Sequence, residues 1–290
     1  MTGVQTCALP ISGMDKKLWY HENKAKFAKY HAKIIHVIVD DMPQNVTAWD
    51  REYHQRNAIR RGLDQLHGVL VDDDLIIISD VDEIPDAETI QNMALDSSLL
   101  DNKIYCLQQN MFYYHFNCRA QIPWSHPEFA RLDTVLQSTP ESIRSGGNKI
   151  PVARGGWHFS YFMSIDNIIN KIRSFSEQQF NQPQYTDPVK IRELVRNCQD
   201  LFFRNNEHTH NFRYTPLESM TYLPKNYRII LPLYVYIYVD GYSITGDLIQ
   251  HLVSDWNIDN IYIYQDDNKI GRATSELQSH SFISYAVFCL

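Results

Sequence analysis

The stretch IIISDVDEIP, Ile76–Pro85, places the carboxylates of Asp80, Asp82 and Glu83 directly after a run of apolar residues. Carboxylates gathered in this way repel one another unless a cation lies between them. Mn²⁺ and Mg²⁺ bind carboxylate oxygens, and the phosphates of a nucleotide complete their coordination. A turn between Asp80 and Asp82 lets both reach one ion, which would favour departure of a phosphate leaving group. The alternative is that the acids only cap the following helix, a task that Asp86 could perform alone.

The segment GGWHFSYF, Gly155–Phe162, holds a second candidate site residue, His158. The two glycines let the backbone approach a ligand closely. An imidazole here could complete a metal site begun by Asp80 and Asp82. The alternative is a histidine that packs in the core and binds nothing.

Arg56 is a charge on the apolar face of an expected helix, seven residues after Trp49. A charge in that position needs a partner. Glu52 lies four residues earlier, one helical turn away, and we favour this structural pairing. The alternative is that Arg56, together with Gln55, reaches toward the site, which makes Arg56 a candidate cofactor-binding residue.

Apolar patterning predicts the elements that position these residues. Strands are expected at 33–39, 75–79, 104–114 and 155–162. Helices are expected at 48–70 after a capping box of Thr47 and Asp50, at 86–95, after Ser164, and from Asp187-Pro188 onward. Residues 119–150 show weak periodicity and are expected to be irregular. The alternation predicts an α/β fold, in which ligands bind at the carboxyl ends of strands.

Composition narrows the classes of protein. The net charge is −7, with no basic tract that would track nucleic acid. No apolar run is long enough to span a bilayer, and the first residues do not have the pattern of a secretory signal. The five cysteines show no metal-ligand spacing, so we expect reduced thiols and, by default, a cytoplasmic protein.

Both ends of the chain look foreign to the rest. Met1–Ser12 resembles one reading frame of a sequencing-library adapter, and Thr274–Leu290 resembles the opposite adapter read outward. We therefore expect residues 1–12 and 274–290 to be artefacts that take no part in the fold.

Three segments in this order resemble glycosyltransferase family 17: WDREYHQRNAIRRGL, then DDLIIISDVDEIP, then GGWHFSYF. SFSEQQFNQPQYTDPVKIRELV and TYLPKN are similar to later parts of that family. Its best-known members are the β-1,4-mannosyl-glycoprotein 4-β-N-acetylglucosaminyltransferases. The resemblance covers about Leu18 to Tyr242. We therefore divide the chain into a family-17-like domain at 13–242, an unassigned extension at 243–273, and the two adapter-like ends.

The resemblance implies a GT-A-like, Rossmann-related fold with a mixed sheet flanked by helices. It also implies a UDP-GlcNAc donor, Mn²⁺ or Mg²⁺ as cofactor, and a glycan or glycoprotein acceptor. Asp80 and Asp82 match the family's Asp-x-Asp motif, and Glu83, Trp157 and His158 match adjacent positions of the family pattern. We take Glu83 and Trp157 as candidate cofactor-binding residues. We expect transfer with inversion, in which a carboxylate deprotonates the acceptor hydroxyl.

The residues that would act on the acceptor are less constrained by the pattern. Glu177 and Glu128 are the candidates for the base, by their position relative to aromatic segments. Tyr113, Tyr114 and Trp124 could stack on sugar rings or be ordinary packing aromatics.

The chain departs from the family pattern at its start. The strand and helix that usually precede the segment beginning at Leu18 are missing, so we expect the first strand to be absent and the chain to be a poor catalyst. We expect the adapter-like Met1–Ser12, interrupted by Pro10, not to pair in its place. Eukaryotic relatives are Golgi or membrane-associated proteins, although no transmembrane segment is present in this sequence.

Two other functions remain open on the sequence. Phosphohydrolases of the haloacid-dehalogenase type also carry Asp-x-Asp after an apolar strand, but they place threonine or valine where this chain has Ile84. A glycan-binding protein without turnover is the other alternative. Hydrolysis of the donor in the presence of manganese separates the three.

Overall fold

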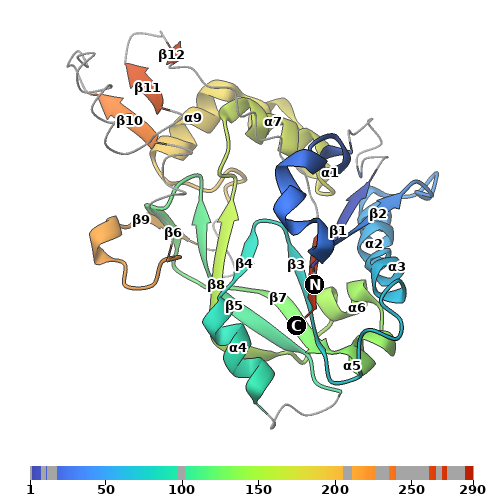
Figure 1. Ribbon diagram of the computed structural model, residues 1–290. Coiled ribbons are helices and arrows are strands. Elements are labelled where there is room, and N and C mark those ends of the chain that lie inside the picture. Colours follow the sequence, from blue (N-terminus) through green and yellow to red (C-terminus); the bar gives the residue numbers. More distant parts are fainter. Residues whose placement is uncertain are drawn as a thin grey trace.

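The protein has a mixed sheet flanked by helices, as the α/β prediction requires (Figure 1). The computed structural model describes residues 2–7, 11, 18–96, 102–204, 211–225, 235–239, 261–265, 270–272 and 285–289. Within this part, ten strands form one sheet in the order β2-β1-β13-β3-β7-β5-β6-β9, with β8 paired to β5 and β4 paired to β8. Three more strands form a separate sheet, β10-β11-β12.

The strands of the main sheet are β1 (Thr2–Cys7), β2 (Ile34–Val39), β3 (Leu75–Asp80), β4 (Glu83–Pro85), β5 (Tyr105–Tyr113), β6 (Cys118–Ala120), β7 (Trp124–Arg131), β8 (Ile150–Ser160), β9 (Phe212–Tyr214) and β13 (Tyr285–Cys289). The small sheet consists of β10 (Val235–Val239), β11 (Ile261–Gln265) and β12 (Ile270–Arg272).

The described α-helices are α1 (Trp19–Glu22), α2 (Ala48–Asn57), α3 (Ile59–Asp64), α4 (Ala87–Leu95), α5 (Leu132–Leu136), α6 (Pro140–Ser145), α7 (Ile165–Ser174), α8 (Pro183–Thr186) and α9 (Pro188–Arg196). The described 3₁₀ helices, which are more tightly wound than α-helices, are η1 (Lys24–Lys33), η2 (Gln178–Phe180) and η3 (Leu217–Ser219).

Strand β3 is buried on both faces, which explains its continuous apolar sequence. Ile76 and Ile78 pack with residues of α3, α5 and α6. Leu75 and Ile77 pack with Ile90 of α4 on the other face. Helices therefore cover both faces of the sheet at the strand that ends in Asp80.

The helix starts follow the sequence signals. Thr47 and Asp50 form the expected capping box, and the side chains of Asp86, Ser164 and Asp187 cap α4, α7 and α9. The single helix expected at 48–70 is wrong, however, because it divides at Ala58 into α2 and α3.

The prediction that residues 119–150 are irregular is wrong. They contain β7, which lies between β3 and β5 in the sheet, and the short helices α5 and α6. Residues 127–130 of β7 are all buried, so the strand has no alternation of apolar and polar positions. Pro127 also argues against an interior strand, because proline removes a ladder hydrogen bond.

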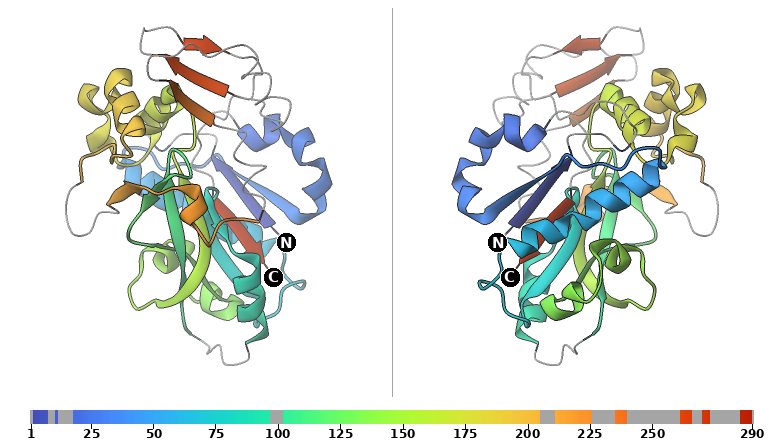
Figure 2. Two further views of the ribbon diagram at one scale, coloured as in Figure 1. Left: turned by 90° about the vertical axis from the view of Figure 1, so that its left-hand side faces the viewer. Right: turned by 90° about the vertical axis from the view of Figure 1, so that its right-hand side faces the viewer.

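The ends of the described chain take part in the sheet, contrary to expectation. Thr2–Cys7 pairs in parallel with β2, and Tyr285–Cys289 pairs antiparallel with both β1 and β3. Figure 2 shows the blue β1 and the red β13 side by side. The expectation that the first segment does not pair beside β2 is therefore wrong, whereas the adapter-like origin of both ends stays a prediction. Most of the extension at 243–273 lies outside the described residues.

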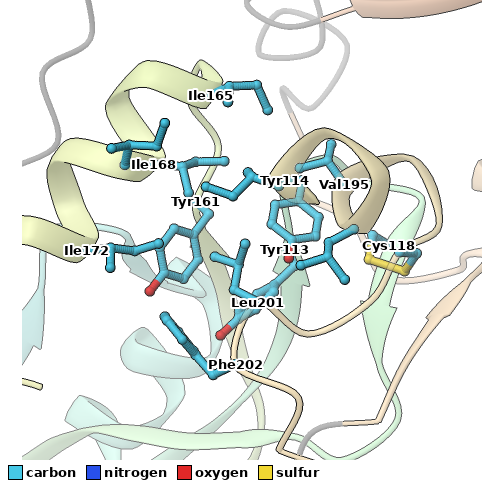
Figure 3. Close-up of a cluster of buried hydrophobic side chains, with 14 of the residues drawn as sticks. Tyr113, Tyr114, Cys118, Tyr161, Ile165, Ile168, Ile172, Val195, Leu201 and Phe202 are labelled. Carbon is cyan, nitrogen blue, oxygen red and sulfur yellow. A yellow bond between two sulfur atoms is a disulfide. The ribbon is translucent and has the colours of Figure 1, made fainter. Parts of the chain in front are cut away.

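A third core cluster fixes α7 and α9 against the ends of β5 and β8 (Figure 3). Ile168 and Ile172 of α7 pack with Tyr114 and Val195 in this cluster. At its edge a disulfide joins Cys118 of β6 to Cys198, 80 residues later in the chain. The expectation of reduced cysteines is wrong for this pair, while Cys106 is a free, buried thiol. Across the described residues, no helix has the length and apolarity needed to cross a bilayer.

Candidate functional site

A cavity of about 360 Å³ opens beside the carboxyl end of β3. Its walls come from helices, from strand ends and from connecting segments, most of which are distant from one another in sequence. The lining residues are Trp49, Glu52 and Arg56 from α2; Asp80, Val81 and Asp82 from the end of β3; Met111 and Tyr113 from β5; Trp124 and His126 from β7; Arg144 from α6; His158, Ser160 and Tyr161 at the end of β8; and Lys171, Phe175, Ser176, Glu177, Phe202 and Arg204 from α7 and the segments after α7 and α9.

Asp80 and Asp82 both line this cavity but have different partners. Asp80 Oδ2 accepts a hydrogen bond from Arg144 Nη2 at 3.2 Å, while Asp80 Oδ1 is buried with no hydrogen-bond partner among the described residues. Asp82 lies 3.5 Å from Lys171 Nζ and 3.6 Å from His158 Nε2. The two carboxylates thus face the cavity with different amounts of compensating charge.

The pKa values of the two carboxyls diverge for this reason. Burial raises the pKa of Asp80, with Arg144 opposing the shift and Glu83 and Asp82 adding to it. Burial would also raise the pKa of Asp82, but Lys171 and His158 outweigh it and hold that pKa below its usual range. Asp80 is therefore the carboxyl that gains most from an added cation.

The side chains that could coordinate a metal ion fit a cation held by two carboxylates rather than by three protein ligands. In the described part of the chain, no group of three or more His, Cys, Asp or Glu residues is arranged to hold a metal ion. His158 Nε2 faces Asp82, and His158 Nδ1 is buried with no hydrogen-bond partner among the residues that the structure describes. The unpartnered oxygen of Asp80 suits a divalent cation, and Mg²⁺ commonly takes one or two carboxylates with the remaining ligands from substrate phosphates and water.

Glu83 does not line the cavity but holds the parts of the site that do. Its buried carboxylate accepts from both Arg144 nitrogens at 2.6 and 2.9 Å, from Trp124 Nε1 at 2.6 Å and from the backbone N–H of Asp80 at 2.8 Å. Burial would raise the pKa of Glu83, but Arg144 outweighs it and lowers that pKa. Glu83 is therefore an ionised support for Asp80, Trp124 and Arg144.

Of the two residues predicted as the base, the structure places one at the cavity. Glu128 is fully buried, outside the cavity lining, and bound by Lys149 at 2.6 Å, by Arg144 at 3.2 Å and by His126. Glu177 lines the cavity, and burial raises its pKa despite the opposing charge of Arg204. Of these two carboxylates, only that of Glu177 therefore lies at the cavity wall.

Of the other predicted residues, some line the cavity and some do not. Arg56 pairs with Glu52 at 2.6 Å, which confirms the structural pairing, and also with Glu141, yet its side chain still lines the cavity. Trp157 lies outside the lining, where its Nε1 donates to the Tyr222 carbonyl at 3.3 Å. Gln55 is fully buried and likewise outside the lining.

Aromatic side chains form much of the remaining wall. Tyr113 and Trp124 line the cavity as the stacking hypothesis requires, but Tyr114 is buried elsewhere and donates to the Gln199 carbonyl at 2.7 Å. Sequence reasoning missed four further lining aromatics: Trp49, Tyr161, Phe175 and Phe202.

Sequence reasoning also missed three cations, Arg144, Lys171 and Arg204. Arg144 fell in the segment expected to be irregular. Lys171 could have been noticed, because it lies three residues after the buried Ile168 and therefore on the same face of its helix. Arg204 binds Asp200, four residues earlier, at 2.9 Å. It also binds Tyr113 Oη, 91 residues earlier, at 3.0 Å, a contact that no local pattern indicates.

Comparison with known proteins agrees with the resemblance seen in the motifs. The family model described as glycosyltransferase family 17 matches residues 7–244, which is most of the chain. The comparisons with curated proteins and with solved structures found no match.

Proposed function

The chain belongs to glycosyltransferase family 17, and from this premise we propose that it transfers N-acetylglucosamine from UDP-GlcNAc to a glycan or glycoprotein acceptor. We propose further that the transfer inverts the anomeric carbon and depends on Mn²⁺ or Mg²⁺. Membership of the family implies a nucleotide-sugar donor and a glycan acceptor. The identity of the sugar, the stereochemistry and the metal are the proposed part.

The observation that carries this proposal is the pair Asp80 and Asp82 at the wall of the cavity, with Asp80 Oδ1 buried and unpartnered among the described residues. Asp80 and Asp82 would hold the cation, and Glu83 and Arg144 would keep Asp80 in place. A bound divalent cation would stabilise negative charge on the departing diphosphate.

Glu177 would act as the catalytic base. Its carboxylate would take the proton from the acceptor hydroxyl, whose oxygen then forms a bond to the anomeric carbon as the bond to the UDP oxygen breaks. Attack from the face opposite the leaving group gives inversion. The raised pKa of Glu177 makes it a stronger base than an exposed glutamate. Tyr113, Trp124 and Phe202 offer apolar surface to sugar rings.

The first experiment is calorimetric titration of UDP into the protein with and without Mn²⁺. We expect Asp82→Asn to abolish the manganese-dependent part of UDP affinity while leaving the melting temperature nearly unchanged. Asp166→Asn is the matched control, because Asp166 is an exposed acid in the first turn of α7. Unchanged manganese-dependent affinity in Asp82→Asn would remove Asp82 from the site.

The second experiment defines the reaction. UDP release is measured from UDP-GlcNAc, UDP-glucose, UDP-galactose and UDP-GalNAc with Mn²⁺, and the anomeric configuration of any product is read by NMR. The proposal is supported if UDP is released slowly and if release from UDP-GlcNAc is faster than release from the other three nucleotide sugars. Cleavage of simple phosphate esters would instead indicate a phosphohydrolase, and UDP-GlcNAc binding without any release would indicate a binding protein.

A further inference from the structure

Lys171 presents a cation to the cavity from a rigid support. It lies on α7, whose residues Ile168 and Ile172 are buried in the core and whose first turn is capped by Ser164. Its ammonium lies 3.5 Å from Asp82 Oδ2 and 4.6 Å from the centre of the Tyr161 ring. The side chain is 18% exposed, at the cavity wall. Helix α7 therefore places a positive charge beside Asp82, one of the two carboxylates of the proposed metal site.

The ammonium is only partly satisfied by this arrangement. Lysine has three N–H donors, and in the described part of the chain Lys171 Nζ meets one acceptor, at the long end of hydrogen-bonding distance. Burial makes an incompletely paired ammonium costly. A ligand with anionic oxygens in the cavity would satisfy the remaining donors.

A cation bound to Asp82 would remove the present partner of Lys171. The bound cation and the Lys171 ammonium would repel each other if both stayed next to Asp82, so the lysine would have to give up its contact with Asp82. Lysine is a point charge on a flexible stem and can move between neighbouring anions. Phosphate oxygens are suitable new partners, because lysine binds phosphate as a point charge.

We propose that Lys171 couples the binding of metal and donor: it neutralises Asp82 before the cation binds and binds the donor's diphosphate afterwards. This inference rests on the proposed function, because it takes Asp82 as a ligand of the metal and a nucleotide diphosphate as the leaving group. Each ligand then makes room for the other, and by linkage the metal tightens diphosphate binding by the same factor as the diphosphate tightens metal binding.

The test is Lys171→Met, which keeps an unbranched side chain beside Tyr161 and removes the charge. Calorimetry measures Mn²⁺ alone, Mn²⁺ with saturating UDP, UDP with Mn²⁺, and uridine with Mn²⁺. We expect Mn²⁺ alone to bind about threefold to fivefold tighter in the variant, since a competing cation is gone. UDP with Mn²⁺ should bind about tenfold to a hundredfold more weakly, and uridine, which carries no phosphate, should bind within about twofold of wild type.

Arg173→Met is the matched control, because it removes a positive charge from the same helix at an exposed position. It should leave all four titrations unchanged. Lys171→Arg, which retains the charge, should restore most of the coupling between UDP and Mn²⁺. Melting temperatures of all three variants should lie close to that of the wild type.

The outcomes separate this inference from the function on which it rests. If wild type binds UDP with Mn²⁺ and Lys171→Met binds it equally well, the coupling role is wrong and the transferase proposal stands. If uridine weakens as much as UDP, Lys171 shapes the cavity and does not bind phosphate. If wild type shows no manganese-dependent UDP binding at all, the donor class is wrong and this inference falls with it.

Discussion

Replacing Arg144 by methionine removes the cation around which three carboxylates are arranged: those of Glu83 and Glu128, which are buried, and that of Asp80, which is partly buried. The Arg144 side chain is 8% exposed, and its guanidinium lies 2.6 Å from Glu83, 3.2 Å from Asp80 and 3.2 Å from Glu128. Methionine fills much of the same volume, so the loss is chiefly electrostatic. Because the three acids come from β3, β4 and β7, the change tests what holds these strand ends together.

The loss of unfolding free energy expected for Arg144→Met depends on which acid is left without a neighbouring positive charge. Glu128 keeps Lys149 at 2.6 Å, so it is not left without a cation. Glu83 keeps hydrogen bonds from Trp124 and from the Asp80 backbone but loses the fork of Arg144. Removing one partner of a buried ion pair costs about 3–5 kcal/mol of unfolding free energy. We expect a loss in this range for Arg144→Met, and a smaller one for Arg144→Lys, which keeps the charge but not the fork.

The pH dependence of that loss has a defined sign. In the wild type Arg144 lowers the pKa of Glu83, so this carboxylate contributes stability above its unfolded pKa, and the contribution is lost as the pH falls. Without Arg144, burial raises the pKa of Glu83 instead, and the folded state then gains stability from protonation as the pH falls. The difference in unfolding free energy between wild type and Arg144→Met should therefore shrink from neutral pH toward pH 5.

Urea unfolding at both pH values measures this directly. Arg60→Met is the control, because the Arg60–Asp64 pair spans 3.0 Å but is exposed, with 40% and 63% of the two side chains accessible. Such pairs contribute at most about 1 kcal/mol. The reasoning would be refuted if Arg144→Met cost no more than Arg60→Met, or if its deficit were the same at both pH values.

Three further outcomes follow from the structure. Transfer should rise with pH through the raised pKa of Glu177, because the base acts deprotonated, and Glu177→Gln should lower the rate about 10²–10⁴-fold and remove this acid limb in a pH–rate profile. Gly156→Ala should cost more than about 2 kcal/mol in urea unfolding, since φ is +118° and the new Cβ would lie 2.1 Å from a backbone oxygen, whereas Gly147→Ala, with open space around it, should be nearly neutral. Replacing Cys118 and Cys198 together by serine should cost about 2–5 kcal/mol, and the variant, unlike the wild type, should not lose stability in reductant.

The sequence by itself determined the features that rest on neighbouring residues. The buried run before Asp80 predicted β3, because a strand covered on both faces reads as continuous apolar sequence. Thr47, Asp86, Ser164 and Asp187 predicted helix starts, because a cap is made by side-chain atoms two or three residues from the backbone groups they bind. The Asp-x-Asp motif and its place at a strand end were readable for the same reason.

The tertiary structure alone decided which charges serve the site. Glu128 and Glu177 are both acids near aromatic residues in sequence, yet one lies in a buried ion-pair network and the other faces the cavity. Arg144 lies 64 residues from Asp80 and Lys171 lies 89 residues from Asp82, so no local pattern joins them. The position of a charge relative to a partner on another strand or helix is set by how the layers pack, and burial then fixes its pKa.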